Sequence, residues 1–133
     1  DSIGLAEEIN KRAEKAGLVK DVLVQVNVAQ EETKFGIEYD ETDSFTERLS
    51  GLSSIRVKGL MTIAPYYDDA ELARPVFRRL KEKFDMLAAA SIPNVDMKYL
   101  SMGMTNDYKV AIEEGSNMVR IGTGIFGARN YDL

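Results

Sequence analysis

The feature that most constrains this chain is a regular alternation of amphipathic segments with short apolar runs. Helical spacing of apolar residues predicts four helices, and the apolar, β-branched runs between them predict four strands. The predicted helices cover residues 3–16, a segment that begins at Ser44, 69–90 and 107–114; the predicted strands cover 21–29, 55–63, 96–101 and 117–121, with a loop over 30–37. This αβαβαβαβ order predicts an α/β fold with a parallel sheet and helical crossovers.

Local signals predict where several helices begin. The run Ser44–Glu47 is the pattern of a capping box, and Asn106 stands where the last predicted helix needs a cap. Pro75 lacks a backbone N–H and therefore suits only the first turn of a helix. The segment 69–90 then either begins as a regular helix near Glu71 or contains a kink.

Two architectures accommodate this order of elements. Crossovers are right-handed, so strands in sequential order curl with their helices on one side. Four such units make half of a (β/α)8 barrel of the TIM type. The alternative is a flavodoxin-like open sheet that is complete as it stands, and periodicity favours neither. A half-barrel leaves two parallel edges and an inner face uncovered, so we expect either the missing N-terminal half or a second copy of the chain to cover them.

The composition excludes several classes of site. The 133 residues include no cysteine and no histidine, which excludes disulfides, thiolate or imidazole metal ligands, and Ser-His or Cys-His nucleophile pairs. The net charge is −5 without a Lys/Arg run, so we expect no nucleic-acid partner. No apolar stretch approaches the roughly 20 residues of a membrane helix, so we expect no membrane partner. Since the chain begins with neither a signal peptide nor an initiator Met, we expect it to start within a longer protein.

Polar side chains are found where the predicted strands end. In parallel α/β folds, ligands bind at the carboxyl ends of the strands. These ends carry Asn27, Met61–Thr62, Ser101 and Arg120–Gly122, which we expect to converge on one ligand. A guanidinium in a buried strand needs a partner, so Arg120 binds either a ligand or a carboxylate from another strand.

The remaining charged residues indicate a site less clearly. Lys34 lies near this rim but on a loop, whereas Lys58 and Lys98 lie at strand starts, so no strand-borne lysine is predicted to form a Schiff base. The acidic pairs Glu31–Glu32, Asp68–Asp69 and Glu113–Glu114 are most simply interpreted as solvated surface charge.

The last predicted strand runs into a glycine-rich turn. Residues 122–127 match G-x-G-x-x-G, but too few residues follow for the acidic residue of a dinucleotide-binding fold. Two interpretations remain: backbone N–H groups that hold a phosphate, as barrels often do after their last strands, or a tight turn that needs glycine. Thr105 likewise either donates its hydroxyl to a phosphate or caps the following helix.

Five segments form a specific combination that spans nearly the whole chain, the last two being the most distinctive. They are Val22–Asn27, Thr33–Ile37, Lys58–Ile63, Leu100–Asp107 and Val119–Gly127. Together they resemble the pyridoxal-phosphate homeostasis protein family, single-domain relatives of the alanine racemase barrel. The resemblance implies a (β/α)8 barrel with pyridoxal 5′-phosphate at its carboxyl rim, of which residues 1–133 are the C-terminal half. It also implies that the cofactor lysine belongs to the first barrel strand, in the N-terminal half that this chain lacks.

Carried over by position, the resemblance assigns five residues to the cofactor site. Thr105 resembles a phosphate ligand, although the family usually has Ser there, and Gly122 and Thr123 resemble backbone donors to the phosphate. Arg120 resembles the group that faces the pyridine nitrogen or the phosphate, with Ser101 supporting it.

The resemblance further implies a non-enzymatic, cytoplasmic protein that binds and delivers pyridoxal 5′-phosphate. An arginine facing the pyridine nitrogen keeps that nitrogen neutral and weakens the ring as an electron sink, which suits a carrier. One alternative is an amino-acid racemase of the same fold, which needs acid-base groups on both faces of the substrate Cα. Another is an unrelated phosphate-binding barrel enzyme whose catalytic residues lie in the missing half.

Overall fold

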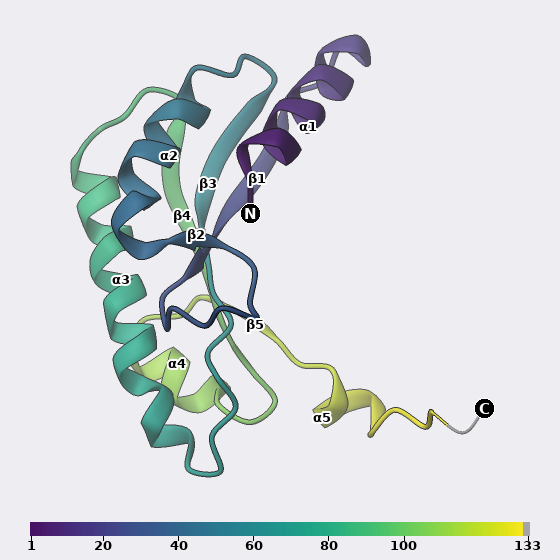
Figure 1. Ribbon diagram of the computed structural model, residues 1–133, viewed down its shortest axis with the longest axis vertical. Helices are drawn as coiled ribbons and strands as arrows, with labels where there is room; N and C mark the ends of the chain where they lie inside the picture. The colour runs from purple at the N-terminus through teal and green to yellow at the C-terminus, as the bar shows by residue number, and fades with distance from the viewer. Residues whose placement is uncertain (132–133) are drawn as a thin grey trace.

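The computed structural model describes residues 1–131, which form one parallel sheet with helices packed against it. The strands are β1 (Lys20–Asn27), β2 (Ile37–Glu38), β3 (Ile55–Met61), β4 (Val95–Met104) and β5 (Met118–Arg120). The helices are α1 (Ile3–Lys15), α2 (Thr42–Ser50), α3 (Arg74–Ala89), α4 (Tyr108–Glu113) and α5 (Thr123–Phe126), with 3-10 turns at Tyr39–Glu41 and Ala70–Ala73. Figure 1 shows α2, α3 and α4 along one side of the sheet, while α5 projects away from that layer. The predicted α/β fold with parallel strands is confirmed.

The strand order is β2-β1-β3-β4-β5, so the four longer strands follow one another in chain order. β2 lies at the edge and pairs with β1 only at Val26–Ile37 and Asn27–Glu38. The prediction of an unpaired loop up to Ile37 is therefore wrong at its last residue. No helix separates β1 from β2 in the described chain, so β2 is not the crossover strand that a flavodoxin-like reversal requires.

The first helix begins as the sequence predicts, whereas the regular part of the third begins at Arg74, later than the predicted start near Glu71. The N–H of Leu5 donates to the Ser2 hydroxyl at 3.3 Å, and Gly17, with φ of 67°, follows the end of α1. Before α3 the chain makes the 3-10 turn over 70–73, and Pro75 lies in the first turn of the helix that follows. Pro75 therefore removes no helical hydrogen bond, because that N–H would have no partner within the helix.

Two predicted helix caps are wrong. α2 begins before Ser44, whose hydroxyl donates to the carbonyl oxygen of Glu41 at 3.0 Å instead of capping the helix. The cap position of α4 is Asp107, and the side chain of Asn106 bonds elsewhere. Both errors have the same cause, since a helix start depends on the path of the preceding loop as well as on the local residues.

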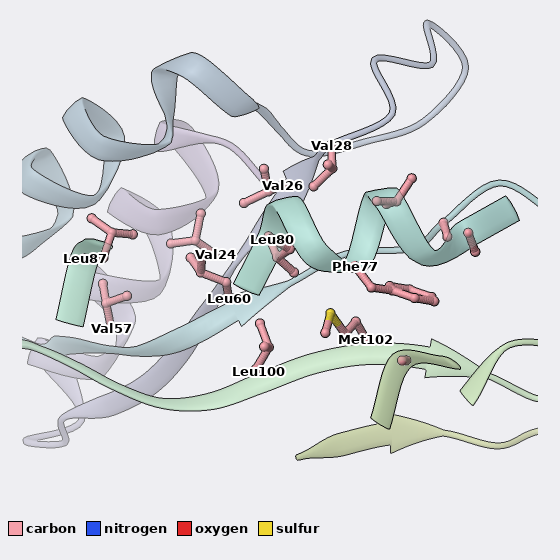
Figure 2. Packing of buried hydrophobic residues seen from close by; sticks show 14 of the residues in the cluster. Val24, Val26, Val28, Val57, Leu60, Phe77, Leu80, Leu87, Leu100 and Met102 are labelled. Atoms are coloured by element: carbon pink, nitrogen blue, oxygen red, sulfur yellow. The ribbon is translucent and has the colours of Figure 1, made fainter. Parts of the chain in front are cut away.

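The core lies between the sheet and α3 (Figure 2). Side chains of β1, β3 and β4 that are at most 1% exposed face this layer, as do side chains of α3 that are fully buried. The strand residues are Val24, Val26, Leu60, Leu100 and Met102, and the helix residues are Phe77 and Leu80. Full burial of such a side chain contributes about 1.5–3 kcal/mol relative to exposure. This packing fixes the strands, and it therefore fixes the loops at their carboxyl ends relative to one another.

Candidate functional site

A hollow with a volume of about 780 Å³ lies at the carboxyl ends of β1, β3, β4 and β5. The loop after each of these four strands contributes to its lining. Residues that line it include Lys34, Ala64, Tyr66, Thr105, Asn106 and Thr123. The hollow lies at the strand ends as expected, but the expected convergence is largely wrong: of the strand-end residues named from the sequence, Gly122 is the one that lines it among the described residues, and the loops supply most of the lining.

Thr105 is the centre of a small cluster of hydroxyl and amide groups. Its Oγ1 accepts hydrogen bonds from the N–H of Gly124 at 3.1 Å and from the hydroxyl of Thr123 at 3.2 Å. A Cβ added at residue 124 would lie only 3.0 Å from Thr105 Cγ2, so glycine permits this approach. Gly122 and Thr123 line the same hollow as Thr105. The structure thus brings these three predicted residues together, and their role as phosphate ligands stays a prediction.

Arg120 ends β5 with an unsatisfied side chain. Its Nε is buried and has no hydrogen-bond partner within residues 1–131, and its Nη2 lies 3.7 Å from Met61 Sδ, a weak acceptor. Buried polar groups are nearly always paired. The Nε of Arg120 can therefore bind an anionic partner without breaking an existing hydrogen bond. Arg120 does not itself line the hollow but comes two residues before Gly122, which does. Ser101 pairs in register with Met118, and no hydrogen bond joins it to Arg120 in the described chain.

Two polar residues expected at the ligand serve the fold instead. Asn27 is 8% exposed, and its amide donates to the carbonyl oxygen of Glu31 at 2.9 Å while accepting from the N–H of Glu31 at 3.2 Å. The hydroxyl of Thr62 donates to the carbonyl oxygen of Val26 at 2.7 Å. Both side chains therefore have their hydrogen-bonding capacity engaged within the protein.

The loop after β1 places Lys34 at the rim. Gln25 Nε2 donates to the carbonyl oxygen of Phe35 at 3.2 Å, which holds the loop against its own strand. Lys34 Nζ donates to the carbonyl oxygen of Ala64 at 3.1 Å and lies 3.1 Å from a carboxylate oxygen of Glu31. The expected position of Lys34 near the rim is confirmed, and its ammonium group bridges two neighbouring loops.

The sequence prediction missed the contact that Asn106 makes. Its Nδ2 donates to the carbonyl oxygen of Tyr67 at 2.8 Å, across 39 positions of sequence. The cap position belongs to Asp107, whose Oδ1 accepts from the N–H of Met104 at 2.7 Å. No local pattern contains this information, because the carbonyl partner is brought close only when β3 and β4 pair.

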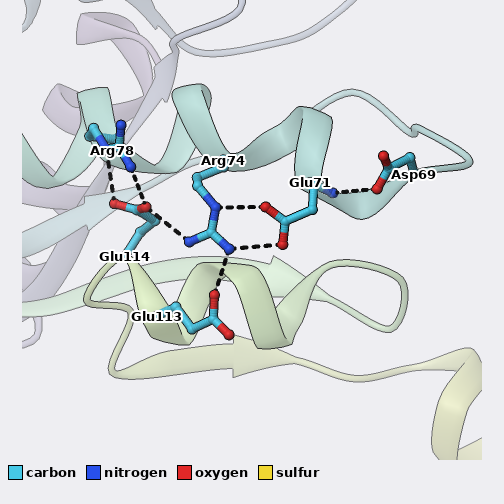
Figure 3. Close-up of polar contacts among 6 residues, drawn as sticks. All are labelled: Asp69, Glu71, Arg74, Arg78, Glu113 and Glu114. Carbon is cyan, nitrogen blue, oxygen red and sulfur yellow. Dashed lines mark hydrogen bonds and ion pairs between the residues drawn. The ribbon is translucent and has the colours of Figure 1, made fainter.

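A cluster of charged side chains lies outside the hollow, between α3 and α4 (Figure 3). Arg74 donates to Glu71 at 2.8 Å, to Glu113 at 2.5 Å and to Glu114 at 3.1 Å, and Arg78 shares Glu114 at 2.9 Å. Hydrogen bonds from Arg78 and then Arg74 hold the pKa of Glu114 below its usual 4.5, and Arg74 lowers the pKa of Glu71 in the same way. The interpretation of Glu113 and Glu114 as merely solvated charge is therefore incomplete, since they bind arginine.

The described residues lack a cluster of metal-ligating side chains. Residues 1–131 contain no group of three or more carboxylate, histidine or cysteine side chains that could hold a metal ion. Within the same residues, no helix combines the length and the apolar character needed to cross a bilayer.

Comparison with known proteins gives consistent matches along the chain. Residues 1–130 match the family described as alanine racemase, N-terminal domain. Over 131 residues the chain is 49% identical to the pyridoxal phosphate homeostasis protein of Aquifex aeolicus, covering 98% of this chain and 57% of that protein. The chain thus spans little more than half the length of this curated relative.

Solved structures agree with the fold. A protein of unknown function from Bifidobacterium adolescentis superposes with a TM-score of 0.89 at 39% identity, covering 95% of this chain and 50% of that one. PipY of Synechococcus elongatus with pyridoxal phosphate bound superposes with a TM-score of 0.82 at 28% identity, covering 96% of this chain and 58% of PipY. The matching part of each structure is therefore a portion of a longer chain.

Proposed function

The chain belongs to the alanine racemase N-terminal domain family, and from that premise we propose that it binds pyridoxal 5′-phosphate as part of a protein of cofactor homeostasis. The relative that matches this chain almost from end to end carries that name, although the chain spans little more than half of that relative, and PipY holds the cofactor. The proposed role is that of a carrier, which retains the cofactor and releases it, rather than that of an enzyme.

The observation that carries this proposal is the buried Nε of Arg120, which has no hydrogen-bond partner in the part of the chain that the structure describes. An anionic or aromatic-nitrogen acceptor would supply that partner. Nearby on the same rim, the Thr105 hydroxyl and the backbone amides of Gly122 and Thr123 offer neutral donors suited to phosphate oxygens. The residues present therefore fit a ligand with a phosphate and a polar aromatic ring.

When bound, pyridoxal 5′-phosphate supplies an aldehyde that reacts with amines and a ring that can delocalise charge. In this proposal Thr105, Gly122 and Thr123 hold its phosphate, and Arg120 faces its ring nitrogen or its phosphate. An arginine accepts no proton, so it does not help the ring to stabilise negative charge. This property favours carriage over amino-acid chemistry.

We further propose that residues 1–133 form the C-terminal half of a (β/α)8 barrel. The sequential order of the four longer strands supports this arrangement, as does the coverage of just over half of the Aquifex relative. In that arrangement the N-terminal half, with the cofactor lysine, pairs with the open edges of the sheet.

Calorimetric titration with pyridoxal 5′-phosphate of the complete protein, in which residues 1–133 are joined to the proposed N-terminal half, tests the proposal. We expect saturable binding of one cofactor per chain, and no racemisation of L-alanine by the loaded protein in a coupled assay. Absence of saturable binding would refute the assignment of the cofactor site to these residues. Racemisation above the rate with free cofactor would refute the role as a carrier.

A further inference from the structure

The loops that form the hollow are joined in series by side-chain hydrogen bonds. Lys34, after β1, donates to the carbonyl oxygen of Ala64, after β3, at 3.1 Å. Asn106, after β4, donates to the carbonyl oxygen of Tyr67, in the same loop after β3, at 2.8 Å. The loop after β3 is therefore held from both sides by side chains that also line the hollow.

The series continues through the neighbour of Asn106. Thr105 Oγ1 accepts from the N–H of Gly124 at 3.1 Å, which joins the loop after β4 to the turn after β5. Asn106 and Thr105 are consecutive, yet they bond to opposite neighbouring loops. A change in the path of the backbone at Asn106 would therefore move the Thr105 hydroxyl.

We propose that Asn106 is a positioning residue for the ligand site. Its bond to the Tyr67 carbonyl fixes the loop after β4, and the loop in turn fixes the Thr105 hydroxyl for a phosphate group. The inference rests on the proposed function, since that function supplies the phosphate. Asn106 is exposed to solvent, so its bond adds little to global stability, and the proposal concerns local geometry.

Asn106→Ala, made in the full chain, tests this role with two measurements. Without ligand, the Gly124 amide should exchange its hydrogen faster than in the original protein, because Thr105 no longer stays in place to accept from it. With ligand, the dissociation constant for pyridoxal 5′-phosphate should rise about three- to tenfold, the effect of one hydrogen bond. The midpoint of thermal unfolding should change little.

Asn94→Gly is the matched control. Asn94 Nδ2 also donates to carbonyl oxygens, of Leu52 and Ile55, but at the amino ends of the strands, and its φ of 64° suits glycine. This variant should leave both the Gly124 exchange and the cofactor affinity unchanged.

The outcomes separate the inference from the proposed function. If the original protein binds the cofactor and Asn106→Ala binds it equally well, the positioning role is wrong while the proposed function stands. If Gly124 exchange is unchanged in Asn106→Ala, the coupling between the loops is wrong whatever the ligand. If the original protein binds no cofactor, the proposed function fails, and the role of Asn106 toward a phosphate fails with it.

Discussion

Arg74 and Arg120 are two arginines of one small molecule in opposite situations. Arg74 binds three carboxylates, from Glu71, Glu113 and Glu114, and these hydrogen bonds raise the pKa of its guanidinium. Arg120 has no such partner in residues 1–131, and its buried Nε bonds to nothing there. The first arginine joins two helices, whereas the second lies at the strand ends where ligands bind in parallel α/β folds.

The contrast distinguishes an arginine that stabilises the fold from one that is available to bind a ligand. A guanidinium that the fold uses has its acceptors supplied by the same chain, as Arg74 has. A guanidinium that is partly buried without acceptors costs stability, so its retention indicates a partner that comes from outside. If this distinction holds, Arg74 serves stability alone and Arg120 serves binding alone.

The largest effect is expected for Arg120→Met, which removes the charge and keeps an unbranched stem. Affinity for pyridoxal 5′-phosphate should fall about ten- to hundredfold, because a hydrogen bond to a charged group contributes roughly 1.5–3 kcal/mol. The midpoint of thermal unfolding should stay the same or rise, since a buried unpaired donor is lost. Calorimetric titration and thermal unfolding measure the two quantities. A lower midpoint with unchanged affinity would assign Arg120 to the fold.

A smaller loss of affinity is expected for Thr105→Val, which keeps the shape of the side chain and removes its hydroxyl. Cofactor affinity should fall about tenfold or somewhat less, the effect of one neutral hydrogen bond. Thr105→Ser is the control, since it keeps the hydroxyl and should bind nearly as the original protein does. Equal titration curves for the Val and Ser variants would show that the hydroxyl does not contact the ligand.

Arg74→Met should affect stability and not binding. Removal of the guanidinium leaves three neighbouring carboxylates without their shared cation, so the midpoint of thermal unfolding should fall by a few degrees. Lys81→Met is the control, because it breaks one exposed pair within a helix, with Asp85, and should change the midpoint much less. Weaker cofactor binding by Arg74→Met, measured by titration, would contradict the separation of the two arginines.

The smallest expected effect is the dependence of the unfolding midpoint on pH. The folded-state pKa values of Glu71 and Glu114 are below their usual 4.5, so their contribution to stability is present above that pH and is lost as the pH falls through the folded-state values. The difference in unfolding midpoint between the original protein and Arg74→Met should therefore shrink when the pH is lowered from about 6 to about 3. Thermal unfolding in a pH series measures it. A difference that stays constant would show that these ion pairs do not stabilise the fold.

The regular part of the fold follows from sequence because its signals are local. Strands β1, β3, β4 and β5 and the helices between them were predictable from apolar spacing, and the first turn of α3 from Pro75. β2 was not predictable, because a strand of two residues is too short to show an alternating pattern. It forms only because Val26 and Asn27 of β1 lie beside it. The extent of β4 was also underestimated, since its final residues pair without a clear change in composition.

The candidate site divides in the same way. The rule that ligands bind at strand ends pointed to Arg120 and Gly122 from the sequence, and the family resemblance added Thr105. It could not separate Asn27, which is engaged by its own loop, from Arg120, whose Nε has no acceptor within residues 1–131. Nor could it find Asn106, whose partner is distant in sequence. Burial and pairing are properties of the packed molecule, so residue types and spacing do not determine them.

The absence of histidine and cysteine from the chain has a consequence for its response to acidity. The hydroxyls and backbone amides around Thr105 do not ionise near neutrality, and an arginine keeps its charge throughout that range. A phosphate ester does ionise there, with its second proton lost near pH 6. Between mildly acidic and neutral solutions, these protein groups present an almost invariant surface, so the protonation of the phosphate itself would govern how tightly they hold it.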